Sequence, residues 1–167
     1  MNLDLSPTPA VKKLMIGLLA IWLGFSILIN FLELTWAGEL YTALSLTPSQ
    51  VLSEGKLWQV LTYSVLHDLS SPSHVIFNLI ALLFLAPPLE RRWGYRGFVQ
   101  FAFYSALIAG IFTLICGLVA PGYFGARVVG VSGVVMAVLA AFSFVMPNAT
   151  ILLFFVIPVQ ARWIVWL

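Results

Sequence analysis

A serine between two glycines opens one of the most apolar runs of the sequence. Residues 130–133 read Gly-Val-Ser-Gly, and the run that follows, as far as Met146, carries no charge. A serine hydroxyl can attack a carbonyl carbon when a neighbouring base takes its proton. Small residues four apart, such as Gly133 and Ala137, also let two helices approach closely. Ser132 is therefore a candidate nucleophile, and close helix packing is the alternative interpretation.

A histidine and an asparagine lie four residues apart in a second apolar run. On a helix, His74 and Asn78 would share one face. An imidazole and a carboxamide that face a serine can form an oxyanion hole, which stabilises the tetrahedral intermediate of acyl transfer. The backbone amide of Ser132, at a helix N-terminus, would add a third donor. Each residue also has a structural interpretation, as an interfacial histidine and as an asparagine that bonds a neighbouring helix.

His67 and Asp68 are the remaining polar candidates, and together they suggest a metal site. A zinc site needs at least three protein ligands, and the sequence has no His-Glu-x-x-His motif and no third ligand in register. The single cysteine, Cys116, lies within an apolar run and has no disulfide partner. We therefore expect neither a metal nor an organic cofactor.

The composition indicates an integral membrane protein of one domain. Of its 167 residues, 62% are hydrophobic and only 8% are charged. A soluble domain carries roughly a quarter of charged residues, so this chain cannot cover itself with a polar surface. Its net charge of +2 is too small to indicate nucleic acid, and we expect the lipid bilayer to be a partner instead.

The apolar runs predict an all-α, polytopic bundle of transmembrane helices. About 20 apolar residues span a bilayer. The expected crossings lie at residues 14–32, 75–89, 98–121 and 130–146, and the start of a fifth lies at 161–167. The segment 33–73, with its charged residues, prolines and aromatic residues, is expected to be an outer loop that contains interfacial helices. A cleavable signal peptide is the alternative for the first run, which is longer than the apolar region of such peptides.

The distribution of basic residues predicts the orientation, because cytoplasmic loops carry an excess of lysine and arginine. One side of the predicted bundle collects Lys12, Lys13, Arg91, Arg92, Arg96 and Arg162. The other side collects only Lys56 and Arg127. We therefore expect a cytoplasmic N-terminus and an outer location for the loop and for Ser132. The location that we expect for the protein is a bacterial inner membrane.

Four motifs, in this order and spacing, resemble the rhomboid family of intramembrane serine proteases. They are LWQVLTYSVLH (57–67), HVIFN (74–78), LERRWG (89–94) and GVSG (130–133), and the resemblance extends to about Arg162. It implies a rhomboid-like fold in which Ser132 is the nucleophile, supported by Gly130 and Gly133. It implies that His74, Asn78 and the Ser132 amide hold the oxyanion. The implied substrates are single-pass transmembrane proteins whose helices unwind readily near the outer face.

The family's base is a histidine on the sixth helix, and nothing here matches it. The sequence contains only His67 and His74, both before Ser132. We expect a longer natural protein that supplies the base, because the given sequence stops inside an apolar run; the stretch alone would be inactive. The alternative is an inactive rhomboid-like protein that binds transmembrane helices. Using His74 as the base would remove it from the oxyanion site.

The chain departs from the family pattern in three places. Gln59 follows Trp58 where many members have arginine, and Met136 stands where an aromatic residue often packs on the histidine. Pro87-Pro88 replaces a glycine, and prolines there would break the last helical turn. The adjacent charges, Glu90, Arg91 and Arg92, are expected to anchor the inner end of this helix. We expect His67 and Trp58 to position the outer loop.

Overall fold

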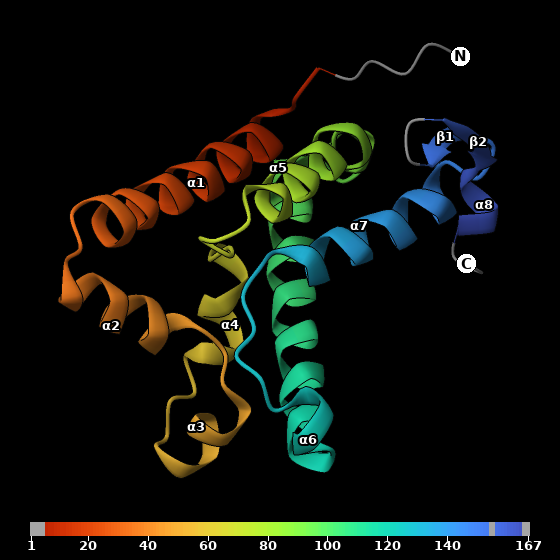
Figure 1. Cartoon of the computed structure of the whole chain (residues 1–167). Coiled ribbons are helices and arrows are strands. Elements are labelled where there is room, and N and C mark those ends of the chain that lie inside the picture. The colour runs from red at the N-terminus through yellow and green to blue at the C-terminus, as the bar shows by residue number, and fades with distance from the viewer. Residues whose placement is uncertain (1–5, 154–155, 165–167) are drawn as a thin grey trace.

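The computed structural model describes residues 6–153 and 156–164, and helices dominate them (Figure 1). Its elements are, in order, α1 (Pro9–Ser26), the π-helical turn η1 (Ile27–Phe31), α2 (Thr35–Leu44), α3 (Pro48–Ser53), α4 (Gln59–Thr62), the 3₁₀ turn η2 (Tyr63–Val65), α5 (Pro72–Val119), α6 (Pro121–Phe124), α7 (Ser132–Val145), β1 (Thr150–Leu153), β2 (Ile157–Gln160) and α8 (Ala161–Ile164). The short elements α2, α3, α4 and η2 lie within the expected outer loop.

Two helical stretches of the described residues are long and apolar enough to cross a membrane. They are Pro9–Phe31, which joins α1 to η1, and Pro72–Val119, which is α5. The helix α7 is apolar but shorter, with 14 residues. Each residue of an α-helix rises 1.5 Å, so the 48 residues of α5 would exceed one bilayer thickness if they formed one straight rod. The number of crossings stays a prediction.

The long helix α5 turns at Gly94, whose backbone has φ 73° and ψ 170°. Only glycine reaches this region easily, because a Cβ would clash with the backbone. Figure 1 shows the change of direction in the green part of α5, after which the chain runs toward α6. The turn separates a first limb, which holds Pro87 and Pro88, from a second limb that ends at Val119.

The expectation that Pro87 and Pro88 break the helix is wrong. The first limb continues through both prolines, and Pro87 is buried together with Ala86 and Leu89. Prolines are tolerated within membrane helices when neighbouring groups satisfy the freed carbonyls. The chain therefore changes direction at Gly94 and not at the two prolines.

The main core lies where α5 meets α1 and α7. Buried apolar side chains come from all three helices and include Val11, Leu18, Leu82, Leu89, Phe98, Val134, Val138 and Phe142. The crossing of α5 and α7 is close, because a Cβ placed on Gly133 would lie only 2.5 Å from the Cβ of Ala109. Gly133 therefore allows the two helices to touch immediately beside Ser132.

The outer segment packs on the second limb of α5. Leu46, Val51 and Tyr63 form a second buried cluster. A Cβ on Gly110 would lie 2.0 Å from the carbonyl oxygen of Val60, so backbone meets backbone at this point. This contact places η2, and with it the residues that follow, against α5.

Glu90 caps the N-terminus of α1 from the first limb of α5. Its buried carboxylate accepts hydrogen bonds from the amides of Ala10 and Val11, both at 2.9 Å, and from the hydroxyl of Thr8. The first amides of a helix have no intrahelical acceptor, and a carboxylate also complements the helix dipole. Arg91 donates to the carbonyl oxygen of Ser6 at 2.9 Å. Glu90 and Arg91 thus have structural partners.

The all-α prediction is wrong for one segment. The strands β1 and β2 pair antiparallel, with Thr150 opposite Gln160 and Leu152 opposite Pro158. Pro147 and Pro158 each lack the amide that a helix needs, and β-branched residues such as Ile151 favour extended backbone. At the expected fifth crossing the structure has α8, and residues 165–167 lie outside the described residues.

Candidate active site

Ser132 is the first residue of α7, where an extended segment of chain enters the helix. Two backbone contacts hold this segment. Val128 pairs with Leu46 through two hydrogen bonds of 2.8 and 3.0 Å, and the amide of Gly130 donates to the carbonyl oxygen of Tyr63 at 3.0 Å. The neighbouring Val131 is buried while Ser132 is exposed, so the chain is anchored just before an exposed serine.

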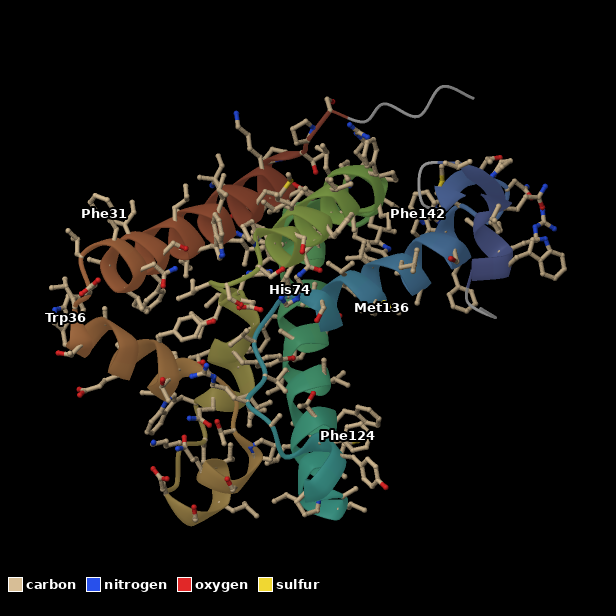
Figure 2. All side chains as sticks on the ribbon, viewed as in Figure 1. Phe31, Trp36, His74, Phe124, Met136 and Phe142 are labelled. Carbon is tan, nitrogen blue, oxygen red and sulfur yellow. The ribbon has the colours of Figure 1, made fainter. Side chains whose placement is uncertain are left out.

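His74 and Ser132 both lie beside Gly130. Gly130 has φ 126°, and a Cβ built on it would lie 3.0 Å from Nε2 of His74 and 3.7 Å from the Ser132 hydroxyl oxygen. The imidazole and the hydroxyl therefore border the same point above Gly130. Figure 2 shows His74 beside the start of α7. The absence of a side chain at Gly130 leaves room for both groups.

Asn78 is connected to this pair through His67. The side-chain nitrogen Nδ2 of Asn78 lies 3.1 Å from Nε2 of His67, and both residues are buried. The rings of His67 and His74 meet edge to face, with centroids 5.3 Å apart. The structure thus brings Ser132, His74 and Asn78 into one region and adds His67 to it.

The contact between His67 and Asn78 is the part of the site that sequence reasoning missed. We expected His67 to position the outer loop, and its carbonyl oxygen does accept a hydrogen bond from the hydroxyl of Tyr41 at 2.9 Å. Its ring, however, turns toward α5. His67 and Asn78 are 11 residues apart, and a bend before α5 lies between them, so no helical periodicity could predict the contact.

The charges at the edge of the site follow from burial and hydrogen bonding. Burial, and then the nearby His74, lower the pKa of His67 from 6.5 to about 4, so its ring is neutral at neutral pH. Hydrogen bonds from the hydroxyl and the amide of Ser70 lower the pKa of Asp68, which keeps its carboxylate ionised. A neutral imidazole can accept a hydrogen bond, as the contact with Asn78 requires.

The outer segment contains a second polar network, centred on Gln59. The side chain of Gln59 is buried, accepts from the amide of Thr47 at 3.0 Å and donates to the carbonyl oxygen of Ala43 at 3.2 Å. The indole of Trp58 donates to the same carbonyl oxygen at 2.9 Å. Sequence reasoning noted Gln59 only as a departure from the family pattern, whereas here it ties the end of α2 to α3 and α4.

Three further features bear on the chemistry of the site. Among the described residues, no side chain or backbone group is a hydrogen-bond partner for the Ser132 hydroxyl, and no cluster of three potential metal ligands occurs. Met136, one turn after Ser132 on α7, is 63% exposed (Figure 2). The region therefore offers an accessible hydroxyl with hydrogen-bond donors beside it.

A comparison with protein families is consistent with this arrangement. The sequence model of the rhomboid domain matches residues 54–167, which is well over half of the chain. The match includes His74, Asn78 and Ser132, and no curated protein matches the chain. The long apolar helices of the chain, together with this match, identify an integral membrane protein. The chain belongs to the rhomboid family.

Proposed function

We propose that the complete protein is an intramembrane serine endopeptidase that cleaves transmembrane proteins. The observation that supports it most is the shared position of the Ser132 hydroxyl and the His74 ring above Gly130. In the proposal, the Ser132 hydroxyl attacks the carbonyl carbon of a peptide bond. The Ser132 amide, His74 and Asn78 donate hydrogen bonds to the resulting oxyanion. One such donor typically contributes about 3 to 4 kcal/mol to the stability of the transition state.

The proton of the Ser132 hydroxyl needs an acceptor other than His67 and His74. His67 bonds Asn78, and its low pKa makes it a weak base. In the proposal, His74 donates to the oxyanion and is not the base. We therefore assign the proton to a histidine supplied outside residues 1–167, as the family resemblance implies. The same histidine would return the proton to the leaving amine.

The proposed setting is a bilayer that the chain crosses four times, with the N-terminus in the cytoplasm. The turn at Gly94 supports it, because each limb of α5 is then long enough to span the apolar layer. Exposed apolar side chains on the second limb suit contact with lipid and include Phe103, Ile108, Phe112, Ile115 and Val119. Single-pass transmembrane proteins are the proposed substrates.

The test compares two serines of one helix in the complete protein, reconstituted in liposomes with a fluorogenic transmembrane peptide. Ser132→Ala should abolish both cleavage and labelling by a fluorophosphonate probe. Ser143→Ala is the matched control, because the Ser143 hydroxyl is buried and donates to the carbonyl oxygen of Leu139 in the same helix. This control should retain activity. Cleavage by Ser132→Ala at the wild-type rate would contradict the assignment.

A second candidate function is a rhomboid-like protein that binds transmembrane helices without cleaving them. One observation favours it: the Ser132 hydroxyl has no hydrogen-bond partner among the described residues. A serine without a base is a weak nucleophile. In that case the wild-type protein would bind a dye-labelled transmembrane peptide in liposomes, and the fluorophosphonate would leave Ser132 unmodified.

A further inference from the structure

We propose that His67 is a positioning residue that fixes the carboxamide of Asn78 in the orientation needed to bind the oxyanion. The inference rests on the proposed function and deepens it, because it assigns a role to a residue that does not itself meet the substrate. Its basis is the hydrogen bond between the two side chains, together with the way the surrounding structure holds His67.

The backbone at His67 is held from two sides. The carbonyl oxygen of His67 accepts from the hydroxyl of Tyr41, and that of Asp68 accepts from the indole of Trp22, both at 2.9 Å. These donors belong to α2 and α1, so two separate helices fix the short connection before α5. The side chain of His67 is 1% exposed, and the ring has little freedom to turn.

The chemistry of the two partners determines the direction of their hydrogen bond. Nδ2 of Asn78 carries two hydrogens and cannot accept, so Nε2 of His67, at 3.1 Å, must be the acceptor. The neutral ring of His67 then carries its proton on Nδ1, a buried atom without a hydrogen-bond partner among the described residues. One Nδ2 hydrogen is engaged with His67, which fixes the plane of the carboxamide. The second Nδ2 hydrogen remains available, and in the proposed mechanism it binds the oxyanion.

The state of His67 suits this role at neutral pH. Burial and the neighbouring His74 hold its pKa near 4, so the ring is neutral and one of its nitrogens has a lone pair that can accept from Asn78. The edge contact between the rings of His67 and His74 also restrains the imidazole that lies against Gly130. His67 thus contacts both side chains proposed to hold the oxyanion.

Two variants of similar size separate the hydrogen bond from the packing of the ring. In His67→Gln, the amide group reaches the position of Nε2 and can accept from Asn78. In His67→Asn, the shorter amide reaches only the position of Nδ1. In the complete protein, His67→Gln should keep kcat within about 3-fold, whereas His67→Asn should lower kcat by about 10- to 100-fold with little change in KM, since a misplaced group costs this much.

A double-variant cycle tests whether His67 acts through Asn78. In an Asn78→Ala background, His67→Asn should cause no further loss of kcat, because the group that it positions is gone. A general structural role would lower the activity by the same factor in both backgrounds. Equal losses of kcat in His67→Gln and His67→Asn, or the same loss from His67→Asn in both backgrounds, would overturn the inference. The proposed function would still stand in that case if Ser132→Ala abolished cleavage.

A spectroscopic readout is independent of turnover. In the complete protein with ¹⁵N-labelled histidine, long-range ¹H–¹⁵N spectra should show a neutral His67 ring protonated on Nδ1, and Asn78→Ala should abolish that preference. A ring protonated on Nε2 would overturn the inference, whatever the activity. Cleavage that persists in Ser132→Ala would instead overturn the proposed function, and the role of His67 in it. Thermal midpoints close to the wild-type value are the control for folding.

Discussion

The ring of His74 lies directly against the backbone of Gly130: a Cβ built there would be 2.8 Å from Cε1 of His74 and 3.0 Å from its Nε2. A real Cβ atom does not lie less than 3.0 Å from a neighbouring side-chain atom. The φ of 126° at Gly130 also disfavours every residue except glycine. Gly130 therefore meets two demands at once. It leads the chain into α7, and it leaves room for the imidazole of His74 on α5 beside the start of α7.

Gly130→Ala should remove nearly all peptidase activity of the complete protein, because the new methyl group must displace His74 or distort the backbone before Ser132. We expect a loss of at least about 100-fold in kcat/KM, the usual cost of displacing a catalytic group by 1 Å. The measurement is cleavage of the reconstituted transmembrane peptide. Gly122→Ala is the control, since a Cβ there meets nothing within 4 Å. Equal activities of the two variants would refute this account.

Gly133→Ala should separate α7 from α5, because the added Cβ would lie 2.5 Å from the Cβ of Ala109. Overpacking of this kind costs about 1 to 3 kcal/mol. Ala109→Gly removes the opposing methyl group, so the double variant should recover part of the lost stability and activity. Thermal unfolding in detergent and peptide cleavage measure the two effects. A double variant that loses as much stability as the two single variants together would count against a direct contact.

Glu90→Ala should destabilise the protein without changing the chemistry at Ser132. The variant leaves the amides of Ala10 and Val11 without their buried acceptor, at a cost of about 1 to 3 kcal/mol. The measurement is the thermal midpoint in detergent. Glu39→Ala is the control, because Glu39 is an exposed carboxylate. A midpoint equal to that of the control would show that the cap contributes nothing.

The stability of the protein should fall as the pH decreases from 6.5 to about 4, in part because of His67. Its pKa is about 4 in the folded protein and 6.5 ordinarily, so the unfolded chain binds more protons within this window. Folding stability then decreases with decreasing pH. His67→Gln cannot titrate, and its thermal midpoint should depend less on pH in this range. Parallel curves for the variant and the wild type would contradict the assigned pKa.

Hydropathy predicted where the long helices lie, because helices that face lipid must be apolar over most of their length. It could not predict the turn at Gly94. The polar run at 90–96 suggested a loop, whereas the helix is interrupted at Gly94 alone. Nor could it predict β1 and β2, because a short apolar run interrupted by proline fits an interfacial helix equally well. In each case the local backbone, and not the apolar pattern, decided the structure.

The motifs indicated Ser132, His74 and Asn78 as candidates because polar groups in apolar helices are costly. The roles of His67 and Glu90 depend on contacts between distant segments. Asn78 lies 11 residues from His67, and Ala10 lies 80 residues from Glu90. Hydrogen bonds between residues so far apart in the sequence depend on how the loops bring the helices together. The periodicity of a single sequence does not encode this arrangement.

The cap on α1 also sets an order of events during biosynthesis. The ribosome makes Ala10 first and Glu90 80 residues later, and at 5 to 20 residues per second the delay is roughly 4 to 16 s. During that interval Glu90 has not yet been made, so the leading amides of α1 lack this acceptor. The cap on α1 can therefore form only after the first limb of α5 has been synthesised and its carboxylate has packed against these amides.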